Sequence, residues 1–305
     1  MSNRRRKGRP VSGWLVLDKP LGMTSTKAVS IIKRLFNAQK AGHAGTLDPL
    51  ATGCLPIALG EATKAMPHVF DSGKTYRFTV RWGIATDSDD AEGQVIGTSE
   101  RRPTPAEIQG AIPAFIGTIE QRPPAFSAVK VDGARAYSLA RGGENPDLKP
   151  RPVVVDRFDI IATDSDQGTF EIDCGKGTYV RSLARDLGEV LGCYGHVSAL
   201  RRISVGPFDE DMMIDLDKLS AAVEENPEEV VDSYLAPVEV ALSSLVGLPL
   251  YERDANRVLR GQAVLLRGAT APVSGSAYAT GGSGQLLAIG EILTGSFHPK
   301  RVFHL

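Results

Sequence analysis

Cysteine is scarce in this sequence. The chain has three cysteines, Cys54, Cys174 and Cys193, which lie far apart and form no Cys-x-x-Cys pair. An odd number of widely spaced thiols gives no disulfide framework and is typical of a reducing compartment. The cysteine content therefore indicates the cytoplasm.

Long apolar runs are missing as well. No stretch reaches the ~20 residues of a membrane-spanning helix. The basic N-terminus "MSNRRRKGRP" lacks the apolar core of a secretory signal. With 42% hydrophobic and 23% charged residues, the composition is typical of a soluble globular protein. A chain of 305 residues exceeds one ordinary core, so we expect a large domain and a small one.

Several chemical signatures are absent. The sequence has no P-loop and no Gly-x-Gly-x-x-Gly motif, so a nucleotide cofactor is not indicated, and it has no Gly-x-Ser-x-Gly elbow. His43 and His196 are isolated, and no cluster has the spacing of metal ligands. The stretch "DSDDAEG" at 87–93 lacks the length and the final glutamate of a calcium loop, so we interpret it as a polar turn. We expect neither a metal nor a cofactor.

Charge is unevenly distributed along the chain. Residues 209–245 contain eleven acidic side chains and one basic one, a net charge of −10; the whole chain carries −1, so the remaining residues carry +9. A basic body can bind a polyanion even when the total charge is near zero. An acidic face that only aids solubility is the alternative, and charge alone does not decide between the two.

The first half of the chain mixes helix and strand patterns. Residues 1–12 are predicted to be a disordered basic tail. Apolar spacing predicts a helix from Ser25, which we take as its N-cap. Strict alternation over 74–86 predicts a half-buried strand. Thr104, Pro105 and Glu107 have the pattern of a capping box that starts another helix.

The second half indicates a further sheet and a small terminal domain. Residues 153–162 and 168–174 have strand patterns, and 178–192 predicts a helix that ends at Gly192. Residues 121–152 are predicted to be a mobile excursion, and 209–235 a linker or helical connector. Short Gly-rich segments after about residue 245 predict a β-rich domain. We therefore expect an α+β fold with a large mixed or antiparallel sheet and flanking helices.

One aspartate stands out in the segment "AGHAGTLDPLATGCLPIALGEATK", from Ala41 to Lys64. Asp48 precedes a proline, so it lies in an extended or turn conformation rather than inside a helix. His43 lies in the same loop, Tyr76 begins a strand, and Tyr179 and Arg181 begin a helix. The residues alone indicate an exposed acid in a glycine-bearing loop, and a plain turn residue is the alternative.

Five segments, in order over about residues 13–208, resemble the successive motifs of the bacterial tRNA pseudouridine-55 synthases. The Asp48 segment above is one of them, and its "GTLDPLATG" string together with a downstream "GTYVRSLARDLG" is highly specific. The others are "DKPLGMTS", "KTYRFTVRWGIATDSDD", "RPPAFSAVKVDGARAYSLARGG" and "CGKGTYVRSLARDLGEVLG…LRRISVGPF". Departures are small: Phe126 stands where the family commonly has tyrosine, and Cys54 lies inside the first long motif.

The resemblance implies a reaction. Such an enzyme cleaves the N-glycosidic bond of uridine 55 in the TΨC loop of tRNA, turns the base and rejoins it through carbon, without a cofactor. Positive charge develops at the anomeric carbon of the sugar, and a carboxylate stabilises or traps it, as in glycosidases. Asp48 matches the family's catalytic aspartate. Covalent addition and proton abstraction both remain open for it.

The resemblance also implies roles for residues around the flipped base. Arg181 pairs with Asp48 and favours the charged carboxylate. Tyr76 stacks on the base, and Tyr179 and Leu200 line its slot. His43 takes the space that the uridine vacates. Core packing is the alternative for Tyr179 and Leu200, a surface charge for Arg181, and a buried structural role for His43.

The implied organisation is a catalytic domain at 13–240, with an insertion at 121–152 that clamps RNA, and a PUA-like domain at 245–305. The implied partner is the T stem-loop of tRNA, bound by a cytoplasmic monomer with no membrane association and no obligate protein partner. An RNA-binding or RNA-folding protein is the competing hypothesis. Lys19 and Lys64 lie in matching motifs. Five basic residues are either phosphate contacts or structural ion pairs: Lys19, Lys130, Arg141, Arg201 and Arg202.

Overall fold

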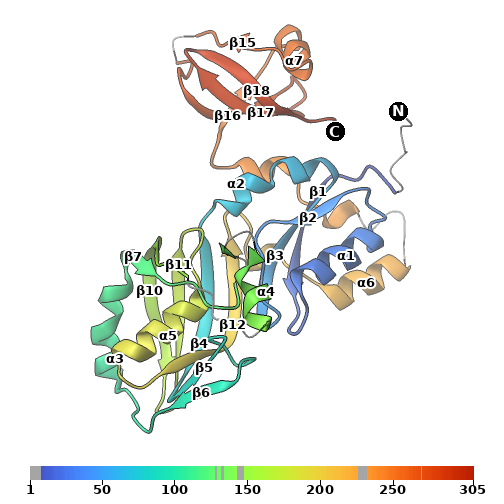
Figure 1. Ribbon diagram of the computed structural model, residues 1–305. Coiled ribbons are helices and arrows are strands. Elements are labelled where there is room, and N and C mark those ends of the chain that lie inside the picture. Colours follow the sequence, from blue (N-terminus) through green and yellow to red (C-terminus); the bar gives the residue numbers. More distant parts are fainter. Residues whose placement is uncertain (1–7, 128, 132–133, 143–147, 226–231, 269) are drawn as a thin grey trace.

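The structure is a computed structural model that describes residues 8–127, 129–131, 134–142, 148–225, 232–268 and 270–305. Figure 1 shows two β-rich units along the chain, a large one with helices beside its sheet and a small one that carries the C-terminus. The fold is the predicted α+β class with a β-rich C-terminal part. No helix among the described residues is long and apolar enough to cross a membrane.

The large unit is built on a nine-stranded mixed sheet of order β13-β1-β3-β12-β4-β11-β10-β7, with β2 also paired to β3. The pairs β1–β13 and β3–β12 are parallel, and the other pairs are antiparallel. The strands are β1 (Gly13–Lys19), β2 (Ala41–His43), β3 (Ala51–Leu59), β4 (Lys74–Trp82), β7 (Gly117–Gln121), β10 (Arg151–Thr163), β11 (Gln167–Cys174), β12 (Gly195–Val205) and β13 (Ile214–Asp215).

Helices bury one face of this sheet. The main core contains the inward side chains of β4, from Tyr76 to Trp82, together with apolar residues of four helices. These helices are α1 (Ser25–Leu35), α3 (Pro105–Ala111), α5 (Val180–Val190) and α6 (Leu216–Glu225). Alternation along β4 puts its apolar side chains in this core, as predicted. The strand is shorter than predicted, because Gly83 adopts φ +84 and Ile84 begins a new strand.

Shorter elements connect these parts. Two hairpins are β5 (Ile84–Thr86) with β6 (Val95–Thr98) and β8 (Lys130–Val131) with β9 (Ala134–Arg135). The short helices are α2 (Met66–Phe70), α4 (Ala136–Arg141), η1 (Gly60–Lys64), η2 (Ile112–Phe115), η3 (Glu210–Met212), η4 (Asp232–Tyr234) and η5 (Val238–Leu242). The hairpin β8–β9 and α4 belong to the predicted excursion at 121–152, of which residues 128, 132–133 and 143–147 lie outside the described part.

Two predictions of helix starts had different outcomes. The capping box of Thr104 and Glu107 is confirmed. The prediction that Ser25 caps α1 is wrong: Thr24 accepts the capping bond from the Lys27 N–H, and the buried Ser25 hydroxyl instead bonds the backbone of Leu47. Sequence spacing did not distinguish the two adjacent hydroxyl residues.

The predicted N-terminal tail and the predicted acidic connector also contain regular structure. Within the predicted disordered tail, residues 1–7 lie outside the described part, but Arg9 forms a β-bridge with Ala38 and an ion pair with Asp232. Disorder is therefore wrong for residues 8–12. The acidic segment is more than a linker, because β13 adds an edge strand beside β1 and α6 packs Leu219 into the core.

The small unit is a five-stranded sheet of order β14-β16-β17-β18-β15 with one helix. Its elements are β14 (Val246–Pro249), α7 (Glu252–Leu259), β15 (Val264–Leu265), β16 (Gly275–Thr280), β17 (Leu286–Leu293) and β18 (Ser296–Val302). Leu286, Ile289 and Phe303 share a second apolar cluster with β1, α2 and η5. The small sheet is thus packed against the large unit near α2 (Figure 1).

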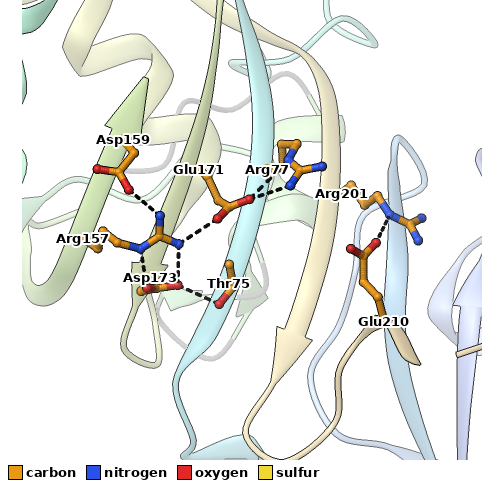
Figure 2. Close-up of polar contacts among 8 residues, drawn as sticks. All are labelled: Thr75, Arg77, Arg157, Asp159, Glu171, Asp173, Arg201 and Glu210. Atoms are coloured by element: carbon orange, nitrogen blue, oxygen red, sulfur yellow. Dashed lines mark hydrogen bonds and ion pairs between the residues drawn. The ribbon is translucent and has the colours of Figure 1, made fainter. Parts of the chain in front are cut away.

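An ion-pair network crosses β4, β11 and β10. Figure 2 shows the Arg157 guanidinium among three carboxylates: it donates to Asp173 at 2.7 Å, Glu171 at 2.8 Å and Asp159 at 2.5 Å. Arg77 shares Glu171 at 2.8 Å. These residues are the outward members of alternating strands, so the network ties three strands together from the side opposite the core.

We predict that Arg157→Met lowers stability by about 1 kcal/mol, because partly exposed ion pairs are screened by solvent. Hydrogen bonds from Arg157 lower the pKa of both Glu171 and Asp173. These two carboxylates therefore contribute their full share to the free energy of unfolding above their unfolded pKa of about 4. This contribution is lost as pH falls through their lower pKa in the folded protein. The difference in unfolding temperature between wild type and variant should shrink at high salt and from about pH 7 to about pH 3.

The matched control is Arg81→Met. Arg81 also points outward from β4 and makes no ion pair with any described residue, so its replacement should leave the unfolding temperature nearly unchanged. A difference for Arg157→Met that does not respond to salt or pH would contradict an electrostatic contribution.

Candidate active site

The Asp48 loop joins β2 to β3 and is held by backbone contacts on both sides. The Ser25 hydroxyl donates to the Leu47 carbonyl and accepts from the Leu47 N–H, both at 2.9 Å. The Pro49 carbonyl accepts from the Gly22 N–H at 2.8 Å. The start of α1 and the turn before it lie well before Asp48 in the sequence, and their contacts with Leu47 and Pro49 set the position of Asp48.

Lys19 is fully buried next to this loop. Its ammonium donates to the carbonyls of Pro20 at 2.9 Å, Met23 at 2.7 Å and Pro49 at 3.4 Å. Burial lowers its pKa to about 8, and the charge of Asp48 acts in the opposite direction. All three donors are used on backbone carbonyls, so Lys19 holds the loop rather than offering a free cation to phosphate.

Asp48 forms the predicted ion pair with Arg181. The Arg181 Nη2 lies 2.9 Å from the Asp48 Oδ2; the Asp48 side chain is 39% exposed, whereas that of Arg181 is 7% exposed. Arg181 is in the first turn of α5 and donates to the carbonyls of Ser88 at 3.0 Å and Phe126 at 2.9 Å. A rigid buried guanidinium thus presents one accessible carboxylate to solvent.

Asp90 is a second carboxylate at Arg181, and the sequence analysis missed it. Its Oδ2 lies 3.5 Å from the Arg181 Nη1, and its side chain is 4% exposed. The Ser88 hydroxyl and the Glu92 N–H bond its other oxygen at 2.5 and 3.0 Å. The stretch 87–93 is indeed a polar turn, but it also supplies this buried acid. Adjacent acids at the end of an apolar strand were the available signal.

Tyr76 and Leu200 lie close to Arg202 on neighbouring strands. Tyr76 of β4 pairs in register with Arg202 of β12, and Leu200 lies opposite Phe78 of β4 and Ala51 of β3. Tyr76 and Leu200 are each 8% exposed. Burial raises the pKa of the Tyr76 phenol, so the ring is neutral near pH 7. Both side chains belong to the core and keep a small exposed surface.

His43 is half-buried on β2, and its Nδ1 has no hydrogen-bond partner among the described residues. Burial, and then the charge of Arg202, lowers its pKa, so the imidazole is neutral near pH 7. Arg202 donates to the carbonyls of Cys54 at 2.7 Å and Gly45 at 3.1 Å. Gly45 has φ +101, a conformation that favours glycine, and this lets its carbonyl face Arg202.

Tyr179 precedes α5 and contacts the inserted segment. It packs against a small apolar cluster of Val129, Ala136 and Leu148. Burial raises the pKa of its phenol, while the charge of Arg181 acts in the opposite direction. Tyr179 thus joins the base of the insertion to the helix that carries Arg181.

The remaining basic residues singled out in the sequence have partners within the protein where their side chains are described. Arg201 pairs with Asp18 at 2.9 Å and Glu210 at 2.9 Å, and Figure 2 shows the Glu210 contact. Lys64 pairs with Glu61 at 2.5 Å and donates to the Val302 carbonyl at 2.7 Å, so it links the two units. These two and Arg202 make structural contacts. The side chains of Lys130 and Arg141 lie outside the described part.

Four of the predicted residues are close enough to interact through charge. Asp48 acts on the pKa of both Tyr76 and Tyr179 through its charge, and it pairs directly with Arg181. His43 and Tyr76 share Arg202 as a neighbouring charge. Among the described residues, no group of three or more His, Cys, Asp or Glu side chains could hold a metal ion. An accessible carboxylate with a guanidinium and aromatic rings is suited to a reaction that develops positive charge on a sugar.

Family models match most of this fold. Residues 33–180 match the TruB family pseudouridylate synthase N-terminal domain, and residues 181–243 match the tRNA pseudouridylate synthase B C-terminal domain. The fold and the family match are those of a pseudouridine synthase, an isomerase that converts uridine in RNA to pseudouridine. The chain belongs to the TruB family.

Similar proteins cover nearly the whole chain. A tRNA pseudouridine synthase B of Bradyrhizobium diazoefficiens is 56% identical, over 99% of this chain and 88% of its own length. One of Agrobacterium fabrum is 54% identical, over 99% of this chain and 97% of its own length. The crystal structure of a Cbf5-Nop10-Gar1 complex contains a chain with a TM-score of 0.74 and 28% identity, covering 96% of this chain and 85% of that one.

Proposed function

We propose that this protein isomerises uridine 55 in the T loop of tRNA and that Asp48 is its catalytic carboxylate. The observation that carries this assignment is the 2.9 Å ion pair between the accessible Asp48 and the buried Arg181 in a chain of the TruB family. A carboxylate with only a turn role needs no buried guanidinium that is itself bonded to two backbone carbonyls.

The reaction begins when the target uridine leaves the RNA stack. The bond between N1 of the base and C1′ of the ribose breaks, and Asp48 stabilises the positive charge at the sugar. The base turns, C5 bonds to C1′, and the C5 hydrogen leaves to water while N1 gains a proton. Arg181 balances the charge of Asp48 when the bound RNA excludes water from the site.

Four residues complete the pocket in this proposal. Tyr76 stacks on the flipped base, and its neutral phenol suits an apolar slot. Tyr179 and Leu200 line the slot beside the ribose and base. His43 fills the space in the RNA that the uridine vacates; burial and the charge of Arg202 lower its pKa, so a neutral ring takes that place.

Other parts of the chain bind RNA around this pocket. Residues 13–240 form the catalytic domain, the insertion at 121–152 clamps the T stem-loop, and the PUA-like part at 245–305 contacts the RNA further away. One chain supplies Asp48, Arg181 and the slot residues, which supports a monomer that needs no protein partner. The three cysteines are buried and unpaired, which supports a reducing cytoplasm.

Tritium release tests the proposed activity. A tRNA transcript with tritium at C5 of every uridine should release about one equivalent to water, because one base is flipped and rejoined through C5. The same transcript with cytidine at position 55 is the control and should release none. Tight tRNA binding without any release would overturn the enzymatic proposal and favour an RNA-binding or RNA-folding protein.

A further inference from the structure

Gln121 is a buried polar residue at an edge of the large sheet. It ends β7, the strand at one end of the sheet order, and is 1% exposed. A buried amide is costly unless its donors and acceptor are bonded. Its oxygen accepts from the Tyr179 N–H at 2.7 Å, and its nitrogen donates to the Tyr179 carbonyl at 3.1 Å. One side chain thus binds both backbone groups of one residue.

Those bonds lie where the chain joins α5. Tyr179 is the N-cap residue, with φ −103 and ψ 110 and no side-chain cap bond, and its carbonyl also accepts the first helical bond from Leu183 at 3.2 Å. Arg181 follows two residues later and reaches Asp48. A change in the Tyr179 backbone would therefore move both its ring and the guanidinium.

The segment after Gln121 runs along the same helix. The Arg122 carbonyl accepts from the Ser182 hydroxyl at 2.8 Å and from Arg185 at 2.9 Å. The Phe126 carbonyl accepts from Arg181 at 2.9 Å. These contacts hold side chains of α5, whereas the Gln121 bonds hold the backbone of Tyr179. Gln121 is thus the point at which the base of the insertion aligns the start of α5.

We propose that Gln121 is a positioning residue for the reaction: its amide aligns Tyr179, and through the start of α5 also Arg181, with Asp48. This inference rests on the function proposed above. Gln121 does not touch the substrate in this account, because its amide is committed to Tyr179. Its effect is therefore expected on the rate of the chemical step rather than on RNA affinity.

Gln121→Leu tests this, because it keeps the approximate volume and removes both bonds. The single-turnover rate constant for tritium release should fall about tenfold to a hundredfold, the size of effect that follows from a small misplacement of a reacting geometry. The dissociation constant for tRNA should change less than about threefold. Ile119→Val is the control, since Ile119 is half-buried in the same strand and lies opposite Val153 of β10. Its rate constant should equal that of wild type.

A second measurement separates positioning from general stability. In a Tyr179→Ala background the bonds of Gln121 to the backbone remain, so Gln121→Leu should still lower the rate through Arg181. The loss should be smaller than in wild type, because the part of the effect that acts through the Tyr179 ring is already absent. If Gln121→Leu does not fold, Gln121→Glu replaces it, which keeps the acceptor for the Tyr179 N–H and loses the donor. A wild-type rate for either variant would overturn the inference, and an equal loss in both backgrounds would overturn the part of it that concerns the Tyr179 ring. Absence of release by wild type would instead overturn the proposed function.

Discussion

Asp48→Asn should abolish pseudouridine formation while tRNA binding persists. The substitution keeps the size of the side chain and removes the charge that the proposed mechanism uses at the sugar. We expect the single-turnover rate constant to fall by about four orders of magnitude, the size of loss seen when a carboxylate acts directly in catalysis. Tritium release measures the rate, and filter binding measures the dissociation constant for tRNA, which should change less than about threefold.

The matched control is Asp71→Asn. Asp71 is another partly exposed carboxylate that pairs with a basic side chain, Lys176 at 3.0 Å, and it follows α2 rather than lying in the Asp48 loop. Its rate constant should stay at the wild-type value. Appreciable tritium release by Asp48→Asn would show that the carboxylate is dispensable, and the catalytic assignment would then be abandoned.

Arg181→Lys should give the second largest loss. Arginine reaches four acceptors from one planar group: the carboxylates of Asp48 and Asp90 and the carbonyls of Ser88 and Phe126. Lysine keeps the charge but lacks the fork that bonds several acceptors in fixed directions. We expect the rate constant to fall by about two to three orders of magnitude, because Asp48 loses its partner and its orientation.

Arg181→Met differs from Arg181→Lys because it removes the positive charge beside Asp48 and Asp90. Removal of the cation leaves Asp90 buried and uncompensated, which costs about 3–5 kcal/mol of stability. Thermal unfolding should therefore separate the two variants, with Arg181→Lys closer to wild type. Arg157→Lys, a replacement on the outward side of the sheet, controls for the loss of an arginine fork away from the site. A wild-type rate for Arg181→Lys would contradict the proposed role of the ion pair.

Much of the fold could be predicted from the sequence, because it depends on local periodicity. Alternation along 74–82 is a property of the chain itself, and so is the apolar stripe of the helix that carries Arg181. The capping box at Thr104 is likewise decided by residues three apart. The choice between Thr24 and Ser25 as N-cap was different, because the Ser25 hydroxyl is bonded to Leu47, which local spacing does not contain.

The site was predictable as a set of residues but not as a geometry. Motif resemblance brought Asp48 and Arg181 together as an expected pair, and the 2.9 Å contact confirms that pairing. Their catalytic roles, and those of the slot residues, stay predictions. Asp90 and Gln121 were missed, because each acquires its meaning only when a turn or an edge strand packs against α5.

What the sequence by itself determined were the element types, the α+β class and the family, since these follow from local periods and from ordered motifs. Tertiary structure alone decided which polar groups became partners. It buried Lys19 on three carbonyls and joined Lys64 to the small unit, although both have the same side chain. The physical reason is that partner choice depends on burial and distance between segments that are remote in the chain, and periodicity carries neither.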